Sequence, residues 1–430
     1  MTPFVQFGIQ WKRGLAVSKR WVMHRRVVGS LLLLLTPLLV PEAWGATRYV
    51  SKSGTDNPTC TQAAPCRSIQ HAVDIAIAGD TVSIGDGKFA ESSGVIINKD
   101  LTVNGTGIFS TRVHGAWPGF SIFHVMSWAT VKITDLDVMF GNAMYGGGIL
   151  NSGNLTLKRV RVWKNSAKVG GGIYNGSGAA LFIDKSEIAH NLASDQMGGG
   201  GLHNQGDAEL NDVRVVKNHA TVGGGGVRNY SNGSLIATGS EISHSDGIGI
   251  INDGSMSLIN TTVSRNNQLG IYTDDWAHTE LIHVTVAENG NGPTLAPDYA
   301  RGGIQGSTDS NIVLVNTIVA NNAPVQCIFP PLPFSPSSTN SLSNDMTCQL
   351  SPGSIAPVDP KLGPLKWNGG YTLTHALKPG SPAIDAGWPA ECELEDQRGV
   401  SRLIDGNGDG APNCDIGAFE YKPKVLEQPH

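Results

Sequence analysis

GGGILN at residues 146–151, GGGIYN at 170–175, GGGLHN at 199–204 and GGGVRN at 224–229 are four copies of one motif. Two degenerate copies follow, GIGIIN at 247–252 and LGIYTD at 269–274. The Asn or Thr that closes the motif recurs after 24, 29, 25, 23 and 21 residues. A short repeated unit of this kind is typical of a solenoid, in which each repeat buries its apolar side chains against its neighbours.

Apolar residues recur near the motifs at offsets 0, 2, 5 and 7, in eight copies that begin with Val131, Ile133, Leu136 and Val138. Steps of two predict β-strands, and the step of three predicts a bend between two short strands. Each unit of about 24 residues then holds three short strands, which predicts a right-handed parallel β-helix with coils ~4.8 Å apart. A β-propeller is excluded, because its units need about 40–50 residues.

Two columns of polar residues follow from this alignment of the coils. The outward column at offset 6 alternates in charge along Asp137, Arg161, Glu187, Arg214 and Glu241, as a ladder between strands requires. We interpret its acids as solvated partners of the basic residues and not as catalytic groups. The second column contains Asn165, Asn191, Asn218, Asn266, Asn289 and Asn322, which suit left-handed turns and can bond amide to amide.

The N-terminus has the pattern of a secretory signal peptide over residues 1–45. Basic residues precede the apolar run 27–40, and Ala43-Trp44-Gly45 suits cleavage before Ala46. An uncleaved N-terminal anchor is the alternative. We therefore expect a secreted protein, extracellular or at a bacterial cell surface.

The net charge of the exported chain limits the classes of partner that it can bind. Removal of six basic residues and Glu42 with the signal peptide changes the formal net charge from −5 to −10. An acidic protein repels nucleic-acid phosphates and anionic membranes. We expect a monomer that binds neither nucleic acid nor, after cleavage, a membrane.

All six cysteines lie beyond residue 45. The sequence has no C-x-x-C pair, the spacing that would indicate a zinc or redox site. Proximity in the sequence favours the disulfides Cys60–Cys66, Cys327–Cys348 and Cys392–Cys414, although six cysteines allow about 15 connectivities. Disulfides are consistent with an oxidising compartment.

The two ends of the solenoid are predicted to be covered. Residues 68–78 place Ile69, Ala72, Val73, Ala76 and Ile77 on one helical face, with Ser68 as N-cap and Gly79 just beyond the helix. This helix would shield the open strand edges of the first coil. At the other end, residues 324–360 are rich in Pro and Ser and are expected to form a linker or capping loop.

These features resemble the pectin-lyase-like parallel β-helix superfamily over roughly residues 48–323. The GGGIxN and VxxN segments, for example Val162 to Asn165, also resemble the repeats of polymorphic outer-membrane adhesins. LKPGSPAIDAG at 377–387, DQRGVSR at 396–402 and CDIGAFEY at 414–421 resemble the choice-of-anchor Q domain of secreted bacterial β-helix proteins. The resemblance implies a β-helix over 46–323 followed by a small disulfide-tied C-terminal domain at 361–430.

A calcium loop is one candidate site in this C-terminal domain. Asp405, Asn407 and Asp409 place oxygen ligands at alternate positions, and Asp415 could supply a further carboxylate. Position 12 is Ile416 and not Glu, so the loop is no EF-hand. A structural Ca²⁺ ion and a turn with no ion both fit.

An acidic cluster late in the solenoid is the candidate catalytic site. Asp253 and Asp274 hold equivalent places in adjacent coils, and Asp275 follows directly. Tyr272 and Trp276 flank them, and a loop carrying Arg301 is inserted nearby. Paired carboxylates serve glycoside cleavage, and close acids bind calcium in lyases. Glycosidases of the resembled fold also show G-H-G and R-I-K motifs, which this chain lacks.

A third candidate is the outward column within the glycine motif, which reads Leu150, Tyr174, His203, Arg228, Ile251 and Tyr272. Tyr, His and Arg on a flat face can stack on sugars, and ordinary outward side chains are the alternative. We expect the protein to bind extracellular polysaccharide or a cell-surface glycan, as an adhesin does. A polysaccharide lyase or glycoside hydrolase and a structural surface spacer are the alternatives, because the fold does not decide function.

Overall fold

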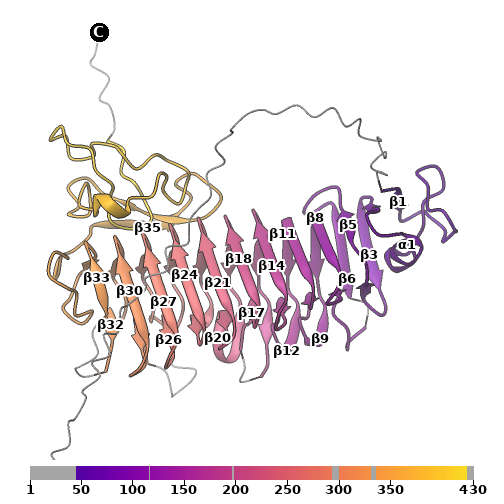
Figure 1. The fold of residues 1–430 in the computed structure, drawn as a ribbon, viewed down its shortest axis with the longest axis horizontal. Coiled ribbons are helices and arrows are strands. Elements are labelled where there is room, and N and C mark those ends of the chain that lie inside the picture. Colours follow the sequence, from indigo (N-terminus) through magenta and orange to yellow (C-terminus); the bar gives the residue numbers. More distant parts are fainter. Residues whose placement is uncertain (1–44, 116, 196–197, 293–299, 331–335, 424–430) are drawn as a thin grey trace, which may run out of the picture. The chain divides into compact units, whose positions relative to one another are not determined.

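The computed structural model describes residues 45–115, 117–195, 198–292, 300–330 and 336–423. The predicted signal peptide therefore lies outside the described residues, apart from Gly45. Figure 1 shows strands that follow one another along a stack of coils, with the segment that contains β35 beside the later coils. The predicted parallel β-helix is confirmed, with about 10 turns.

The coils contribute to two parallel sheets, of 21 and 13 strands, and a two-stranded antiparallel sheet lies beyond them. The 21-stranded sheet contains β1 (Thr47–Val50), β2 (Thr81–Ile84), β3 (Gly87–Glu91), β5 (Leu101–Asn104), β6 (Thr111–Gly115), β8 (Thr130–Met139), β11 (Asn154–Trp163), β14 (Ala180–Asp184), β15 (Glu187–Ala189), β18 (Asp207–Asn211), β19 (Arg214–Val216), β21 (Ser234–Thr238), β22 (Glu241–Ser243), β24 (Ser255–Ile259), β25 (Thr262–Ser264), β27 (His278–Ile282), β28 (Thr285–Ala287), β30 (Asn311–Val315), β31 (Ile318–Ala320), β33 (Ser337–Thr339) and β34 (Leu342–Ser343).

The 13-stranded sheet is built from the glycine motifs and the strands that precede them. Its strands are β4 (Val95–Ile97), β7 (Phe123–Val125), β9 (Asn142–Tyr145), β10 (Ile149–Asn151), β12 (Ser166–Val169), β13 (Ile173–Asn175), β16 (Leu192–Ala193), β17 (Leu202–Asn204), β20 (His219–Asn229), β23 (Asp246–Asn252), β26 (Leu269–Thr273), β29 (Gly302–Gly306) and β32 (Cys327–Ile328). The antiparallel pair is β35 (Leu362–Lys366) and β36 (Thr374–Leu377), and a 3₁₀ turn follows at Pro389–Glu391.

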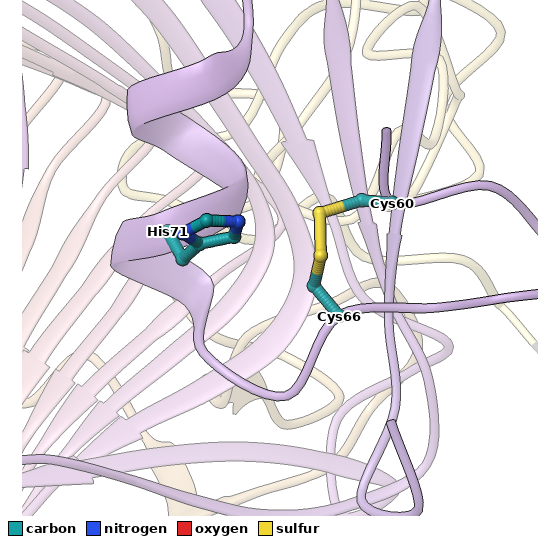
Figure 2. A group of neighbouring side chains, drawn as sticks. All are labelled: Cys60, Cys66 and His71. Carbon is teal, nitrogen blue, oxygen red and sulfur yellow. A yellow bond between two sulfur atoms is a disulfide. The ribbon is translucent and has the colours of Figure 1, made fainter. Parts of the chain in front are cut away.

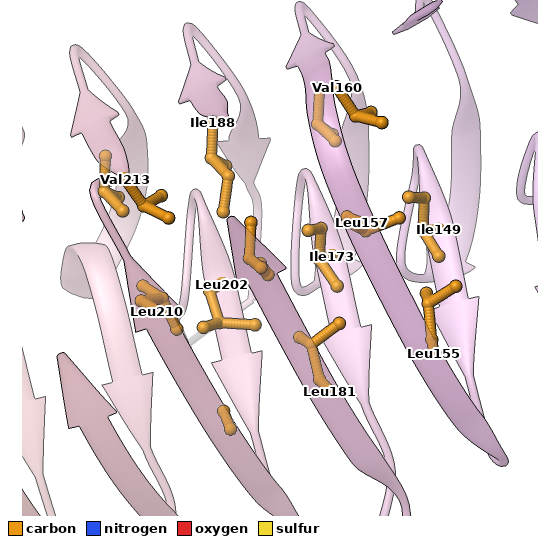
Figure 3. Packing of buried hydrophobic residues seen from close by; sticks show 14 of the residues in the cluster. Ile149, Leu155, Leu157, Val160, Ile173, Leu181, Ile188, Leu202, Leu210 and Val213 are labelled. Carbon is orange, nitrogen blue, oxygen red and sulfur yellow. The ribbon is translucent and has the colours of Figure 1, made fainter. Parts of the chain in front are cut away.

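The apolar repeat forms the core between the sheets. Leu155 and Leu157 are buried and pair with Leu181 and Ile183 of the next coil. Figure 3 shows Leu155, Leu157 and Leu181 among the packed side chains. The predicted bend between offsets 2 and 5 is present, because the residue before the third apolar position adopts a left-handed backbone: Asp135, Arg159, Lys185, Asp212, Gly239, Asn260, His283 and Asn316. The step of three in the sequence therefore encodes a one-residue left-handed turn.

The motif GGGIYN shows how the glycine repeat works. Gly170 has a φ of +66°, a left-handed conformation that glycine adopts without strain. Gly172 lies against the amide of Asn191, where an added Cβ would be 2.9 Å from Nδ2. Ile173 is buried, Tyr174 faces outward and Asn175 is buried again. Each position of the motif thus has a distinct steric role.

Two asparagine ladders run through the stack. The predicted ladder is confirmed: Asn165 Nδ2 donates to Asn191 Oδ1 and Asn191 Nδ2 to Asn218 Oδ1, both at 3.0 Å. The asparagine itself was predicted to be the left-handed residue, and this is wrong. The residue before it has the left-handed backbone, for example Lys164. A second ladder joins the last residues of the motifs, and Asn175 Nδ2 donates to Asn204 Oδ1 at 2.8 Å.

The alternating charges of the first column are also in register. Arg161 pairs with Asp137 on one side and faces Glu187 on the other, and Arg214 lies between Glu187 and Glu241. Arg161 and Arg214 form ion pairs of 2.8 and 2.7 Å with Asp137 and Glu187. The prediction of solvated acids is wrong at Asp137 and Glu241, which are both fully buried.

The N-terminal cap is helix α1 (Ile69–Ile75), whose first turn is capped by Ser68 as predicted: Ser68 Oγ accepts from His71 N at 3.2 Å. The helix ends earlier than predicted, so Gly79 lies in a later turn and Ile77 is 67% exposed. The other four apolar residues of the predicted face are buried. Within the described part of the chain, no helix combines the length and the apolar character needed to cross a bilayer.

The stack does not end at residue 323, because β32, β33 and β34 pair with β29, β30 and β31 of the preceding coil. Segment 324–360 therefore contains the last coil. All three predicted disulfides are present: Cys60–Cys66, Cys327–Cys348 and Cys392–Cys414. Figure 2 shows the first one beside His71 of α1.

We call residues 361–423 the C-terminal segment, and it packs against the side of the coils. Its Leu377, Ile416 and Phe419 share an apolar core with Ile318 and Leu342 of the stack. Buried polar contacts add to this core. Arg402 Nη2 donates to Asn260 Oδ1 at 2.5 Å, and Ser264 Oγ and His375 Nε2 are 2.9 Å apart.

Candidate functional site

A row of ring side chains lies on the outer face of the 13-stranded sheet. The predicted outward column is in register: Leu150 pairs with Tyr174, Tyr174 with His203, and His203 with Arg228. The alternation of each strand places these side chains on the face opposite the core. The sequence therefore predicted the position of the row correctly.

Neighbouring rings of the row lie close to one another, and one of the three pairs is stacked. The ring centroids of Tyr145 and Tyr174 are 5.1 Å apart, those of Tyr174 and His203 are 5.2 Å apart, and those of His203 and Tyr230 are 5.8 Å apart. Tyr174 and His203 are nearly parallel, at 4°. We call these four residues the tyrosine row.

The members of the tyrosine row differ in exposure. Tyr145 is 42% exposed, Tyr174 and Tyr230 are half-buried, and His203 is fully buried. His203 was predicted to contact substrate, but it lies between its neighbours and supports them instead. Gln205 links the row, because its Oε1 accepts from Tyr174 Oη at 2.8 Å and its Nε2 is 3.3 Å from His203 Nε2. Burial raises the pKa of Tyr174.

Sequence reasoning missed Tyr145 and Tyr230. Both flank a glycine motif directly, because Tyr145 precedes Gly146 and Tyr230 follows Asn229. Aromatic residues at the two borders of the motif were the available signal.

A hollow of about 190 Å³ continues the row towards the N-terminal coils. Its lining includes Ile96, Phe120, His124, Met144, Tyr145 and Leu150. Burial lowers the pKa of His124, so this end is apolar and uncharged near neutral pH.

Towards the C-terminal coils the row meets an ion pair. Arg228 Nη2 lies 2.8 Å from Asp253 Oδ2, and the Arg228 guanidinium faces the Tyr230 ring at 5.7 Å. Asp253 Oδ1 is buried and has no hydrogen-bond partner among the described residues. Burial raises the pKa of Asp253, Arg228 opposes the rise, and Asp274 adds to it.

The other two aspartates of the predicted catalytic cluster have hydrogen-bond partners of their own. Asp274 Oδ1 accepts from Tyr272 Oη at 3.1 Å, and Asp275 Oδ1 accepts from Asp309 N at 3.1 Å. Trp276 is 84% exposed, and Arg301 donates to Gly292 O. The structure thus brings Tyr272 to Asp274, whereas the hydrogen bond of Arg301 within the described residues goes to a backbone carbonyl.

The three aspartates do not form a group whose carboxylate oxygens all lie within 4.8 Å of one another. Only two groups of three potential ligand atoms within 4.8 Å occur among the described residues, and neither includes Asp253, Asp274 or Asp275. The two groups are Cys60, Cys66 and His71 (Figure 2), and His283, Cys392 and Cys414. Their sulfurs are joined in disulfides, so they cannot act as thiolate ligands.

The predicted calcium loop is closed by its own backbone. Asp405 accepts from Gly408 N at 2.7 Å and from Gly410 N at 2.8 Å, and Asn407 Oδ1 accepts from Asp409 N. Asp415 is buried, and its oxygens accept from Asp385 N and Tyr421 N instead. The side-chain oxygens of Asp405 and Asn407 thus accept from backbone N–H groups of the loop, and a structural Ca²⁺ ion there stays a prediction.

Comparisons with known proteins agree with the fold. No protein-family model matches the chain. Over 108 residues the chain is 33% identical to pectate lyase PEL9 of Emericella nidulans, and this match covers 25% of each protein. The chain thus matches a quarter of that relative's length.

Solved structures extend the similarity over most of the chain. The crystal structure of pectate lyase Pel9A matches 88% of this chain and 96% of its own, with a TM-score of 0.50 and 13% identity. An alginate lyase from Paenibacillus matches 66% of this chain and 98% of its own, with a TM-score of 0.38 and 12% identity. The chain thus has the parallel β-helix fold of Pel9A, and the named neighbours act on polysaccharides.

Proposed function

We propose that the protein binds a polysaccharide chain lengthwise along the tyrosine row. The observation that carries this proposal is the continuous row of neighbouring rings, Tyr145, Tyr174, His203 and Tyr230, on one sheet face. Tyrosine rings bury an apolar face and keep a hydroxyl that can donate or accept a hydrogen bond, which suits the mixed surface of a sugar.

The periodicity of the row supports a polymeric ligand. The coils repeat every ~4.8 Å, so the sheet presents equivalent positions at a regular spacing to a regular chain. The apolar hollow at one end and the Arg228–Asp253 pair at the other extend the surface beyond the rings. That named neighbours act on polysaccharides supports this class of ligand.

The test compares the wild type with Tyr145→Ala/Tyr174→Ala by affinity electrophoresis in gels that contain polygalacturonate, alginate or a neutral polysaccharide. We expect at least one polysaccharide to retard the wild type and the double variant to lose tenfold or more in affinity. Ile236→Ala is the matched control, because Ile236 is 43% exposed on the other sheet. If Tyr145→Ala/Tyr174→Ala is retarded as strongly as Ile236→Ala, the tyrosine row is not the binding site. If no polysaccharide retards the wild type, the result favours a surface spacer.

Polysaccharide cleavage is the second candidate, favoured by the pectate lyase match and by the carboxyl of Asp253 beside the row. Burial raises the pKa of the Asp253 carboxyl above its ordinary value, which favours the protonated form that can pass a proton to a leaving group. Lyase activity would appear as ultraviolet-absorbing unsaturated products, and hydrolysis as reducing ends without them. Activity that survives Asp253→Asn and Asp274→Asn would reject this site.

We also propose that the mature protein works outside the cell, as an adhesin-type or enzyme-type β-helix with a choice-of-anchor Q-like end. Three disulfides support an oxidising compartment. The predicted mature N-terminus is also placed favourably, because Ala46 N lies 2.7 Å from the buried Asp80 carboxylate. Mass spectrometry of the exported protein should find Ala46 as the first residue.

A further inference from the structure

A groove follows the seam between the stack and the C-terminal segment, on the other sheet from the tyrosine row. It consists of two adjoining hollows, of about 280 and 700 Å³, which share Lys185, Asp212 and Tyr371. We call it the seam groove. Hollows of this size hold small ligands or several linked sugar units.

Three large rings are exposed in the first hollow. Phe109 belongs to the stack and is 58% exposed, whereas Trp367 and Tyr371 belong to the C-terminal segment and are 57% and 52% exposed. Exposed apolar side chains that gather in a hollow mark a binding surface more often than scattered ones do. The groove therefore offers aromatic surface from both parts of the protein.

Each of these rings has a cation near it. The Cζ of Arg161 lies 4.2 Å from the Phe109 ring centroid, that of Arg214 lies 5.1 Å from Trp367, and Lys185 Nζ lies 4.7 Å from Tyr371. A cation–π contact orients a ring through one of its faces. The rings are thus held in place while much of their surface stays in contact with solvent.

The charges of the seam groove balance. Its lining contains five basic and five acidic side chains: Arg159, Arg161, Lys185, Arg214 and Arg398, with Glu187, Asp212, Glu393, Glu395 and Asp396. Arg214 pairs with Glu187 at 2.7 Å, and Arg398 pairs with Asp396 at 2.6 Å. The first hollow has more basic than acidic side chains, but Arg159, Arg161 and Arg214 are each paired with an acid. The groove therefore gives little electrostatic advantage to a polyanion such as a polyuronate.

We propose that the seam groove is a second glycan site, which binds a neutral oligosaccharide. The ligand class follows from the three exposed rings, which suit the apolar faces of sugars, and from balanced donors and acceptors, which suit hydroxyl groups. Because Phe109 and Trp367 come from different parts of the chain, the site exists only when the C-terminal segment is docked. The proposal goes beyond binding at the tyrosine row, since it concerns another face and another ligand class.

The experiment measures binding of xyloglucan, galactomannan and arabinogalactan, with polygalacturonate as the acidic comparison, to the full chain. The variants are Trp367→Ala/Tyr371→Ala for the seam groove and Tyr145→Ala/Tyr174→Ala for the tyrosine row. Trp128→Ala, at a residue that is 65% exposed elsewhere, controls for the loss of a surface tryptophan. Thermal unfolding of each variant checks that the fold is intact, and Trp367→Phe provides a milder change.

We expect the Trp367/Tyr371 variant to lose tenfold or more in affinity for at least one neutral polysaccharide, with Trp367→Phe intermediate. The tyrosine-row variant should keep that affinity, so the failure of one site is distinguishable from failure of the other. The proposal is overturned if no neutral polysaccharide binds the wild type, if only polygalacturonate binds, or if the Trp367/Tyr371 variant binds as well as the wild type. The proposal is also overturned if only the tyrosine-row variant loses affinity for neutral polysaccharides.

Discussion

The third glycine of each motif and the asparagine ladder are parts of one steric arrangement. A Cβ at Gly201 would lie 2.9 Å from Asn218 Nδ2 and 2.7 Å from Gly226 O. The same close approach to an asparagine amide occurs at Gly172 and at Gly249. The amide can enter the stack only because the neighbouring coil has no side chain there, so the two residue types recur together in the sequence.

Asn218→Ala should lower the free energy of unfolding by about 2–4 kcal/mol. Asn218 Oδ1 accepts from the backbone N and from Nδ2 of Asn191, and its Nδ2 donates to Ile188 O. All of these groups are buried, so the substitution leaves them without partners. Chemical denaturation checks the prediction, and Asn291→Ala is the control at an exposed position. Equal stability of the two variants would contradict the role of the ladder.

Ser245→Asn should have the opposite effect. Ser245 interrupts the ladder between Asn218 and Asn266, and its Oγ is buried without a partner among the described residues. Gly226 faces this position just as Gly201 faces Asn218, so the space for an amide is already present. One added buried hydrogen bond should raise the free energy of unfolding by about 1 kcal/mol. A lower midpoint of denaturation than that of the wild type would show that the amide does not fit.

At the scale of elements, the sequence predicted those features that repeat. The spacing of Val131, Ile133, Leu136 and Val138 predicted the extended backbone of β8 and its bend at Asp135, although the structure has one strand there and not two. The next coil has the same register. Helix α1 was predicted with the correct N-cap but the wrong end. Ala76 already has an extended backbone, with ψ of 148°, and no neighbouring copy of the helix exists to reveal this break.

The cap also has a titratable contact that should make its stability depend on pH. Burial raises the pKa of Glu91, at the end of β3, to about 7, and its Oε1 accepts from Ile69 N at 3.3 Å. The folded state therefore holds a proton that the unfolded chain releases near pH 4.5. The stability contributed by this proton is complete below pH 4.5 and is lost as pH rises through about 7.

Glu91→Gln should remove this slope and make the variant more stable than the wild type above pH 7, by at most ~3 kcal/mol. Denaturation at pH 5, 6, 7 and 8 measures the slope. Glu209→Gln, at an exposed glutamate of β18, is the control and should keep the slope of the wild type. A Glu91→Gln variant with an unchanged slope would contradict the assignment.

At the scale of the molecule, the docking of the C-terminal segment could not be predicted from the sequence. Its contacts with the stack join residues far apart in the chain: Arg402 with Asn260, 142 residues away, and His375 with Ser264, 111 residues away. The segment occurs once, so no repeat reveals its partners. For the same reason the seam groove, which needs both parts, was missed, whereas the alignment of Tyr174 with His203 follows from the period of the coils.

Arg402 provides the means to separate the two faces of the molecule. It is fully buried, contacts Asn260 of the stack, and lies 3.5 Å from the buried Glu420 within the C-terminal segment. Arg402→Met removes the donors to Asn260 Oδ1 and Gly417 O, and each buried acceptor left without a partner costs about 1–3 kcal/mol. Arg402→Met should therefore weaken docking while the coils, which are held by their own ladders and core, stay folded.

Limited proteolysis should cleave Arg402→Met within residues 361–423 at least tenfold faster than the wild type, and leave the coils intact. Lys158→Met, which removes the half-exposed pair with Asp184, should be cleaved like the wild type. When docking is lost, binding at the seam groove should be lost too, because Trp367 and Tyr371 move away from the stack. Binding at the tyrosine row should persist. If the segment is released and neutral glycans still bind with full affinity, the stack alone holds them, and the seam groove is not their site.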